Sequence, residues 1–142
     1  MTIAAILQGK GGEVVTIAGD RSVADAIALL ASRRIGAVPV VADATVLGIF
    51  SERDVIYCLE AKGAAALDLA VSAVMTAPAL TVTPDQSVLG ALALVTQRRV
   101  RHLPVVEEGK LVGLVSIGDL VKHRIERIEA DADAMRAYIQ HA

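Results

Sequence analysis

The sequence of 142 residues has few of the residues that mark a special chemistry or compartment. It has no tryptophan, one phenylalanine and two tyrosines, so its core must be built from Ala, Val, Ile and Leu, which the 54% hydrophobic content permits. The single cysteine, Cys58, cannot form an internal disulfide. Because CxxC pairs and zinc-type histidine spacings are also lacking, the sequence predicts no metal site.

The charge pattern excludes further classes. The net charge is −2 and no block of like charge occurs, which argues against a nucleic-acid partner and favours small-molecule or protein partners. Asp43 and Asp68 interrupt the most apolar stretches, leaving no run long enough to span a bilayer, and the N-terminus does not resemble a signal peptide. We therefore expect a cytoplasmic protein without a membrane partner.

The sequence contains an internal repeat. Shifting the chain by 65 positions aligns Thr16 to Ile56 with Thr81 to Val121 without a gap, with 15 identities among 41 pairs. Two copies are too few for a solenoid, so two halves that face each other are expected.

Each copy predicts the order strand, helix, strand, strand, helix. Apolar residues at helical spacing follow Ser22 and Ser87, which are predicted helix caps. The predicted strands are Val14 to Ile17, Ala37 to Val41 and Val46 to Phe50, then Leu80 to Thr83, His102 to Val106 and Leu111 to Val115, with turns at Asp43-Ala44 and Glu108-Gly109. Short helices are predicted at Ile3 to Gln8 and Val71 to Met75.

A proline follows the start of the middle strand in each copy. Pro39 and Pro104 have no N–H to donate, so we expect ladder pairing to be interrupted there. The backbone just before each proline would then be free to bond another molecule.

Each copy ends its third strand with the pattern Gly-x-x-Ser-x-x-Asp, at Gly48 to Asp54 and Gly113 to Asp119. Ser followed three residues later by Asp is close to a capping box, which would explain the pattern structurally. A carboxylate at a helix start can also accept hydrogen bonds from two adjacent hydroxyls, such as those of a ribose. Both interpretations remain open from the residues alone.

The paired units, each with a Pro-Val-Val strand and this closing motif, resemble a tandem pair of CBS domains, a Bateman module, of the stand-alone bacterial type. The resemblance covers about Thr16 to Val121. It implies an α+β (α/β-type) fold of two pseudo-symmetric repeats packed sheet to sheet. It divides the chain into 1–67, the first repeat with its N-terminal helical segment, 68–123, the second repeat, and 124–142, a C-terminal helical extension.

The resemblance also implies an adenosine-containing ligand, AMP, ADP or ATP, with NAD or S-adenosylmethionine as alternatives, in the cleft between the repeats. Asp54 and Asp119 match the ribose-binding position of the family. The sequence positions assigned to sugar or phosphate contacts are Ser51, Ser116, Arg53, Arg101 and His102. Those assigned to the adenine pocket are Val38, Pro39, Thr81, Leu103 and Pro104, although each would serve equally as core packing.

The segment Gly9-Lys10-Gly11-Gly12 resembles a phosphate-binding loop only superficially, because it lacks the Lys-Ser/Thr ending and a preceding strand. We interpret it as a flexible connection.

The C-terminal segment has apolar residues at alternating spacings of four and three, the seam of a heptad pattern. They are Val121, Ile125, Ile128, Ala132, Met135 and Ile139. A helix from Ser116 to Gln140 would overhang its own domain, and either folds back on its own chain or packs across a homodimer interface. Since CBS pairs commonly assemble as dimers, we expect a homodimer.

Three functions compete at this point. The first is a non-catalytic sensor that binds an adenine nucleotide and modulates an unknown protein in trans. The second is a nucleotide hydrolase, disfavoured because no general base, nucleophile or catalytic cofactor can be assigned. The third is a structural dimeric adaptor with vestigial pockets.

Overall fold

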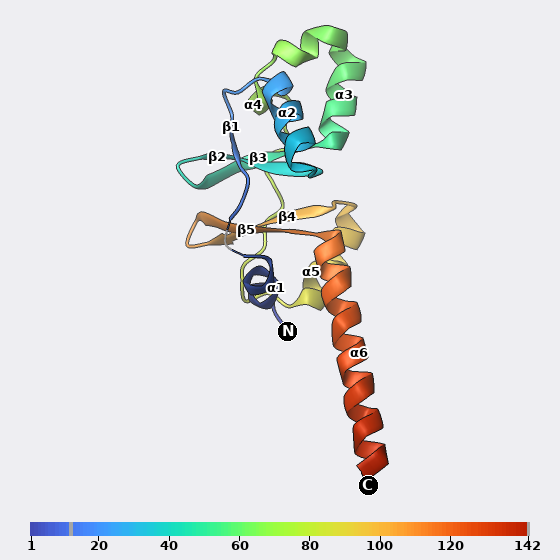
Figure 1. Cartoon of the computed structure of the whole chain (residues 1–142). Coiled ribbons are helices and arrows are strands. Elements are labelled where there is room, and N and C mark those ends of the chain that lie inside the picture. The colour runs from blue at the N-terminus through green and yellow to red at the C-terminus, as the bar shows by residue number, and fades with distance from the viewer. Residues whose placement is uncertain (12, 142) are drawn as a thin grey trace.

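The computed structural model describes residues 1–11 and 13–141 and contains two similar halves (Figure 1). The elements up to the middle of the chain are α1 (Ile3–Lys10), β1 (Ile17–Ala18), α2 (Val23–Arg33), β2 (Ala37–Ala42), β3 (Thr45–Ser51), α3 (Glu52–Lys62), the short 3-10 helix η1 (Gly63–Asp68) and α4 (Val71–Val74). The remaining elements are α5 (Val88–Arg98), β4 (His102–Glu107), β5 (Lys110–Ser116) and α6 (Ile117–His141). The predicted mixed fold with two repeats and a long C-terminal helix is confirmed.

The helices begin at the predicted serine caps. The Ser22 hydroxyl accepts a hydrogen bond from the Asp25 backbone N–H, and the Ser87 hydroxyl accepts one from Gly90. These bonds satisfy N–H groups that the first helical turn leaves unpaired. Arg34 and Arg99 end α2 and α5 in the left-handed conformation, with φ of 54° and 53°.

The two hairpins form at the predicted turns. Asp43 and Ala44 both have positive φ, as do Glu108 and Gly109, which matches the tight turns that follow the natural twist of paired strands. Each hairpin also contains a shift of register shortly after its proline. The shift lies between Val40 and Val41 in the first repeat and between Val105 and Val106 in the second.

The first strand of each repeat is shorter than predicted. Only Ile17–Ala18 forms a strand, parallel to β2, and the expected strand Leu80 to Thr83 is reduced to a single bridge between Val82 and Val105. Continuing the first ladder towards the N-terminus would bring it to Pro39, which has no N–H to donate. The predicted interruption therefore occurs on this side alone, because β2 stays paired to β3 through Pro39 opposite Ile49.

A short helix precedes each repeat, α1 the first and α4 the second, and each of them packs on the other repeat. Ile3 and Ile6 of α1 belong to the core of the second repeat, with Val88, Leu103 and Leu120. In turn, α4 contributes Val71 to the core of the first repeat. The predicted domain 1–67 follows chain order, whereas the packing places α1 in the second half, because its apolar face is buried there.

The two sheets lie one above the other at the centre of the molecule, with α2, α3 and α4 outside the first and α1, α5 and α6 outside the second (Figure 1). A hydrogen bond of 2.8 Å from the Leu111 N–H to the Ala44 carbonyl connects the two hairpins. Helix α6 runs without a break through the predicted boundary at residue 124. Its far half projects beyond the second repeat (Figure 1).

Candidate functional site

A cavity of about 360 Å³ lies between the two repeats. The first repeat contributes the segment before β1 and the segment between α2 and β2, and the second contributes β4, β5 and the start of α6. Its lining residues are Leu7, Lys10, Gly11, Glu13, Val14, Val15, Arg34, Ile35, Gly36, Ala37, His102, Gly113, Leu114, Ser116 and Asp119. Three of the predicted site residues, His102, Ser116 and Asp119, are thus brought together.

Asp119 is fixed at the start of α6 by a reciprocal pair of hydrogen bonds. The Ser116 backbone N–H donates to Asp119 Oδ2 at 2.9 Å, and the Asp119 backbone N–H donates to Ser116 Oγ at 3.0 Å. The capping interpretation of the motif is therefore correct. It does not use up the carboxylate, since the described residues hydrogen-bond only to its Oδ2 oxygen.

The second partner of Asp119 is Lys10, at the end of α1. Its Nζ lies 2.7 Å from Asp119 Oδ2 and 2.8 Å from the Leu114 carbonyl oxygen. Partial burial acts to raise the pKa of Asp119, but the hydrogen bonds from Lys10 and Ser116 outweigh it and hold the pKa below its ordinary value. Asp119 is consequently ionised at neutral pH.

His102 lies at the start of β4, on the wall of the same cavity. Burial lowers its pKa below the ordinary histidine value, and this effect exceeds the opposing influence of the Glu52 and Asp119 carboxylates. The nearby cations Lys10 and Arg101 lower the pKa further. The imidazole is therefore neutral at pH 7, with one nitrogen able to donate and the other able to accept.

Asp54, the counterpart of Asp119, differs from it in burial and in hydrogen bonding. It is only 7% exposed, and its Oδ2 accepts hydrogen bonds from the N–H and the hydroxyl of Ser51 at 2.9 and 3.2 Å. The Thr76 hydroxyl donates to Oδ1 at 2.9 Å. Thr76 is held in place by two backbone hydrogen bonds with Ile49, each of 2.9 Å. Both oxygens of Asp54 are thus occupied, and the residue does not line the cavity.

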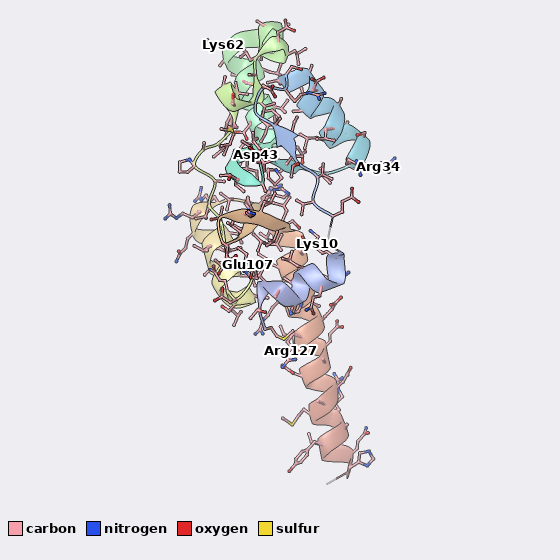
Figure 2. All side chains as sticks on the ribbon, turned by 90° about the vertical axis from the view of Figure 1, so that its left-hand side faces the viewer. Lys10, Arg34, Asp43, Lys62, Glu107 and Arg127 are labelled. Carbon is pink, nitrogen blue, oxygen red and sulfur yellow. The ribbon has the colours of Figure 1, made fainter. Side chains whose placement is uncertain are left out.

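Two predicted phosphate contacts also lie elsewhere. Arg53 donates a hydrogen bond of 3.2 Å to the carbonyl oxygen of Arg99, the residue that caps the C-terminal end of α5. Arg101 is exposed and does not line the cavity. The cations that do line it are Lys10 and Arg34. Figure 2 shows both at helix ends, on the same side of the molecule.

The residues predicted for the adenine pocket also lie outside the lining of this cavity. Val38, Pro39, Leu103 and Pro104 are buried in the repeats, and Thr81 is exposed; none of them lines the cavity. Four of them were assigned from the strand that contains each proline, and Thr81 from the predicted strand Leu80 to Thr83. The apolar wall instead comes from Leu7, Val14, Val15 and Ile35, because the first repeat faces the carboxylate of the second.

The segment Gly9-Lys10-Gly11-Gly12 was interpreted as a flexible connection, which is wrong for Gly9 and Lys10, because they form the end of α1. Gly12 lies outside the described residues. A signal that could have located the helix of Lys10 is a short similarity outside the 65-residue register. Ile6-Leu7 resembles Val74-Met75 at a shift of 68 positions, so both short helices are expected to approach a Gly-x-x-Ser-x-x-Asp motif. Leu7 indeed packs at Gly113, where an added Cβ would lie 2.5 Å from its Cδ2, and Met75 packs at Gly48.

Comparison with known proteins places this architecture in a class. The family model described as CBS domain matches residues 12–61 and 71–126. The chain belongs to the CBS-domain family and contains two copies of the domain, as the sequence resemblance predicted.

Individual relatives agree with this assignment. The chain is 32% identical to the CBS domain-containing protein CBSX3, mitochondrial, of Arabidopsis thaliana, over 98% of this chain and 72% of that protein. The crystal structure of the CBS-domain containing protein ATU1752 from Agrobacterium tumefaciens is 40% identical, with a TM-score of 0.82, over 87% of this chain and 92% of that one. The crystal structure of CBSX2 in complex with AMP is 25% identical, with a TM-score of 0.75, over 88% and 96% of the two chains. Stand-alone bacterial CBS proteins are thus among its structural neighbours.

Within the described residues, no helix is both long enough and apolar enough to cross a bilayer.

Proposed function

We propose that this protein is a non-catalytic sensor that binds one adenosine-containing nucleotide, of the AMP, ADP or ATP class, in the cavity beside Asp119. The observation that carries the proposal is the state of that carboxylate. It is ionised, it is fixed by Ser116 at the cavity wall, and its Oδ1 has no hydrogen bond from the described residues. A pair of ribose hydroxyls would donate to it through charge-assisted bonds.

The rest of the cavity suits the rest of a nucleotide. The apolar side chains of Val14, Val15 and Ile35 can cover the two faces of an adenine, and the backbone around Gly36 can bond to its edge. Lys10, Arg34 and His102 offer donors for phosphate oxygens. The complex of the related CBSX2 with AMP supports this ligand class.

The size of the cavity favours a mononucleotide. Its 360 Å³ lies at the lower end of the range of about 300 to 1,000 Å³ that is typical of small-molecule sites. NAD carries a second nucleotide that this volume does not accommodate, and S-adenosylmethionine carries no phosphate to pair with Lys10 and Arg34, so both are the weaker alternatives.

Isothermal titration of nucleotide-free protein with AMP, ATP, NAD and S-adenosylmethionine tests the proposal. We expect AMP or ATP to bind without turnover, and Asp119→Asn to abolish the binding. Asp54→Asn is the matched control, because it makes the same change at the equivalent position of the other repeat, and it should leave the affinity unchanged. Turnover would favour a hydrolase, and no binding of any ligand would favour a structural adaptor.

We also propose that the protein acts as a homodimer on a partner supplied in trans. The seam of α6 is open in the single chain: Val121 is 42% exposed, Ile128 50% and Ile139 67%. A helix face of this kind at heptad spacing is suited to pairing with a second copy. Sedimentation of the wild type should give a dimer, and Ile128→Glu should give a monomer. A monomeric wild type would contradict the homodimer.

Signalling requires that the ligand prefers one arrangement of the repeats or of the dimer. Because the proposed site is built from both repeats, a ligand in it contacts both and can bias their packing. The cytoplasmic location stays a prediction from the sequence.

A further inference from the structure

Lys10 forms an ion pair with the Asp119 carboxylate, the group to which the ribose of the proposed ligand would bind. Its Nζ is 2.7 Å from Asp119 Oδ2, and the Ser116 N–H is 2.9 Å from the same oxygen. A carboxylate oxygen has two lone pairs, so these two donors fill Oδ2 and leave only Oδ1 open. A single hydroxyl could bind to Oδ1, but a vicinal pair that spans both oxygens requires Lys10 to leave.

The Lys10 ammonium can move away from Asp119 more easily than the Thr76 hydroxyl can move away from Asp54. Thr76 reaches Asp54 through a short side chain whose backbone is paired with Ile49. The side chain of Lys10 is 40% exposed and has four rotatable methylene groups, and the next residue, Gly11, has a φ of 88° and open space around it. Its ammonium can therefore move while α1 stays docked through Leu7 at Gly113.

We propose that Lys10 is an exchangeable latch that selects phosphate-bearing ligands: it pairs with Asp119 in the free protein and transfers to a phosphate when the ribose takes its place. This inference rests on the proposed function, since it concerns the same cavity.

The exchange follows from charge. A neutral nucleoside that displaces Lys10 breaks an ion pair and gives the ammonium nothing but water in return. A nucleotide returns an anion to it, because Lys10 and the second cation Arg34 both line the cavity. Phosphate therefore contributes twice, by its own contacts and by re-pairing the displaced lysine, and the preference for AMP over adenosine depends on Lys10.

The test compares Lys10→Gln with Lys62→Gln. Lys62 is a matched control, because it also ends a helix before a glycine of positive φ, in α3, and it lies far from Lys10 (Figure 2). Adenosine and AMP are titrated into each protein by calorimetry, and thermal unfolding verifies that each variant is folded.

We expect Lys10→Gln to weaken AMP binding about tenfold, the size of one lost charge-assisted bond, while adenosine binds as well as before or better. Lys62→Gln should change neither. If Lys10→Gln weakens AMP and adenosine by the same factor, or changes neither, the latch is wrong although the nucleotide site stands. If wild-type protein binds neither ligand, the proposed function fails and the latch fails with it.

Discussion

The two repeats place the same Ser-x-x-Asp motif at the same position of the fold and give its carboxylate two different fates. Asp54 is buried and accepts hydrogen bonds from Ser51 and Thr76, whereas Asp119 borders a cavity and is paired with a partly exposed lysine. The difference does not arise in the motif. It comes from the short helix that precedes the other repeat: Lys10 at the end of α1 brings an ammonium to Asp119, and Thr76, two residues past the end of α4, brings a hydroxyl to Asp54.

The comparison suggests how a duplicated binding motif can become structural. The Thr76 hydroxyl donates to Oδ1 of Asp54, and the same oxygen of Asp119 has no hydrogen bond from the described residues. On the proposed function, the Thr76 hydroxyl takes up the first carboxylate from within the protein, whereas Lys10 leaves Oδ1 of the second available to a ligand.

The largest expected effect comes from adding a methyl group where each short helix approaches its strand. A Cβ at Gly48 would lie 2.7 Å from the backbone oxygen of Thr76, so Gly48→Ala must displace a backbone segment. We expect a loss of about 2–3 kcal/mol in the free energy of unfolding. The three atoms nearest to a Cβ at Gly113 all belong to the side chain of Leu7, which can shift, so Gly113→Ala should cost about 1 kcal/mol. Urea denaturation of both variants measures the difference, and equal losses would contradict it.

A smaller effect is expected from Thr76→Val, which keeps the shape and removes the hydroxyl. Asp54 Oδ1 then loses its donor at a nearly buried site, which should cost about 1–2 kcal/mol in unfolding free energy. Thr45→Val is the control, because Thr45 is exposed on β3 and makes no side-chain hydrogen bond among the described residues. The closed-site interpretation fails if the two variants are equally stable.

The sequence predicted the repeat, the caps, the hairpins and the long helix, because each depends on local patterns or on similarity between the halves. It also predicted Ser116, Asp119 and His102 at one wall of the cavity. It missed Lys10, Arg34 and the apolar wall, because those residues come to the cavity beside Asp119 from the other half of the chain. Whether the motif carboxylate is open or closed depends on a contact between distant segments, which the motif does not encode.

Proton uptake is a subtler consequence of nucleotide binding. Burial keeps the pKa of His102 below the ordinary value of about 6.5, and a phosphate nearby would raise it. Binding should therefore take up protons, and AMP affinity should rise modestly as the pH falls from about 7.5 to about 6. Calorimetry in buffers of different ionisation enthalpy detects the uptake. It should disappear in His102→Gln, and uptake that persists in this variant would assign it to another group.

The smallest expected effect concerns the ion pair of Lys10 and Asp119 in the free protein. Because the pKa of Asp119 is lowered in the folded state, the pair stabilises the fold above the ordinary aspartate pKa of about 3.9, and this stability is lost as the pH falls below it. Lys10→Gln should cost no more than about 1 kcal/mol at pH 7 and nothing at low pH. Urea titrations at both pH values measure it, and a larger loss at low pH would have the wrong sign.

The stoichiometry of AMP binding tests most directly whether one repeat has an open carboxylate and the other a closed one. Equilibrium dialysis with labelled AMP should give one nucleotide per chain at saturation, lost in Asp119→Asn and retained in Asp54→Asn. Two nucleotides per chain, with one lost in each variant, would show that Asp54 also holds a ligand and would contradict the closed first site.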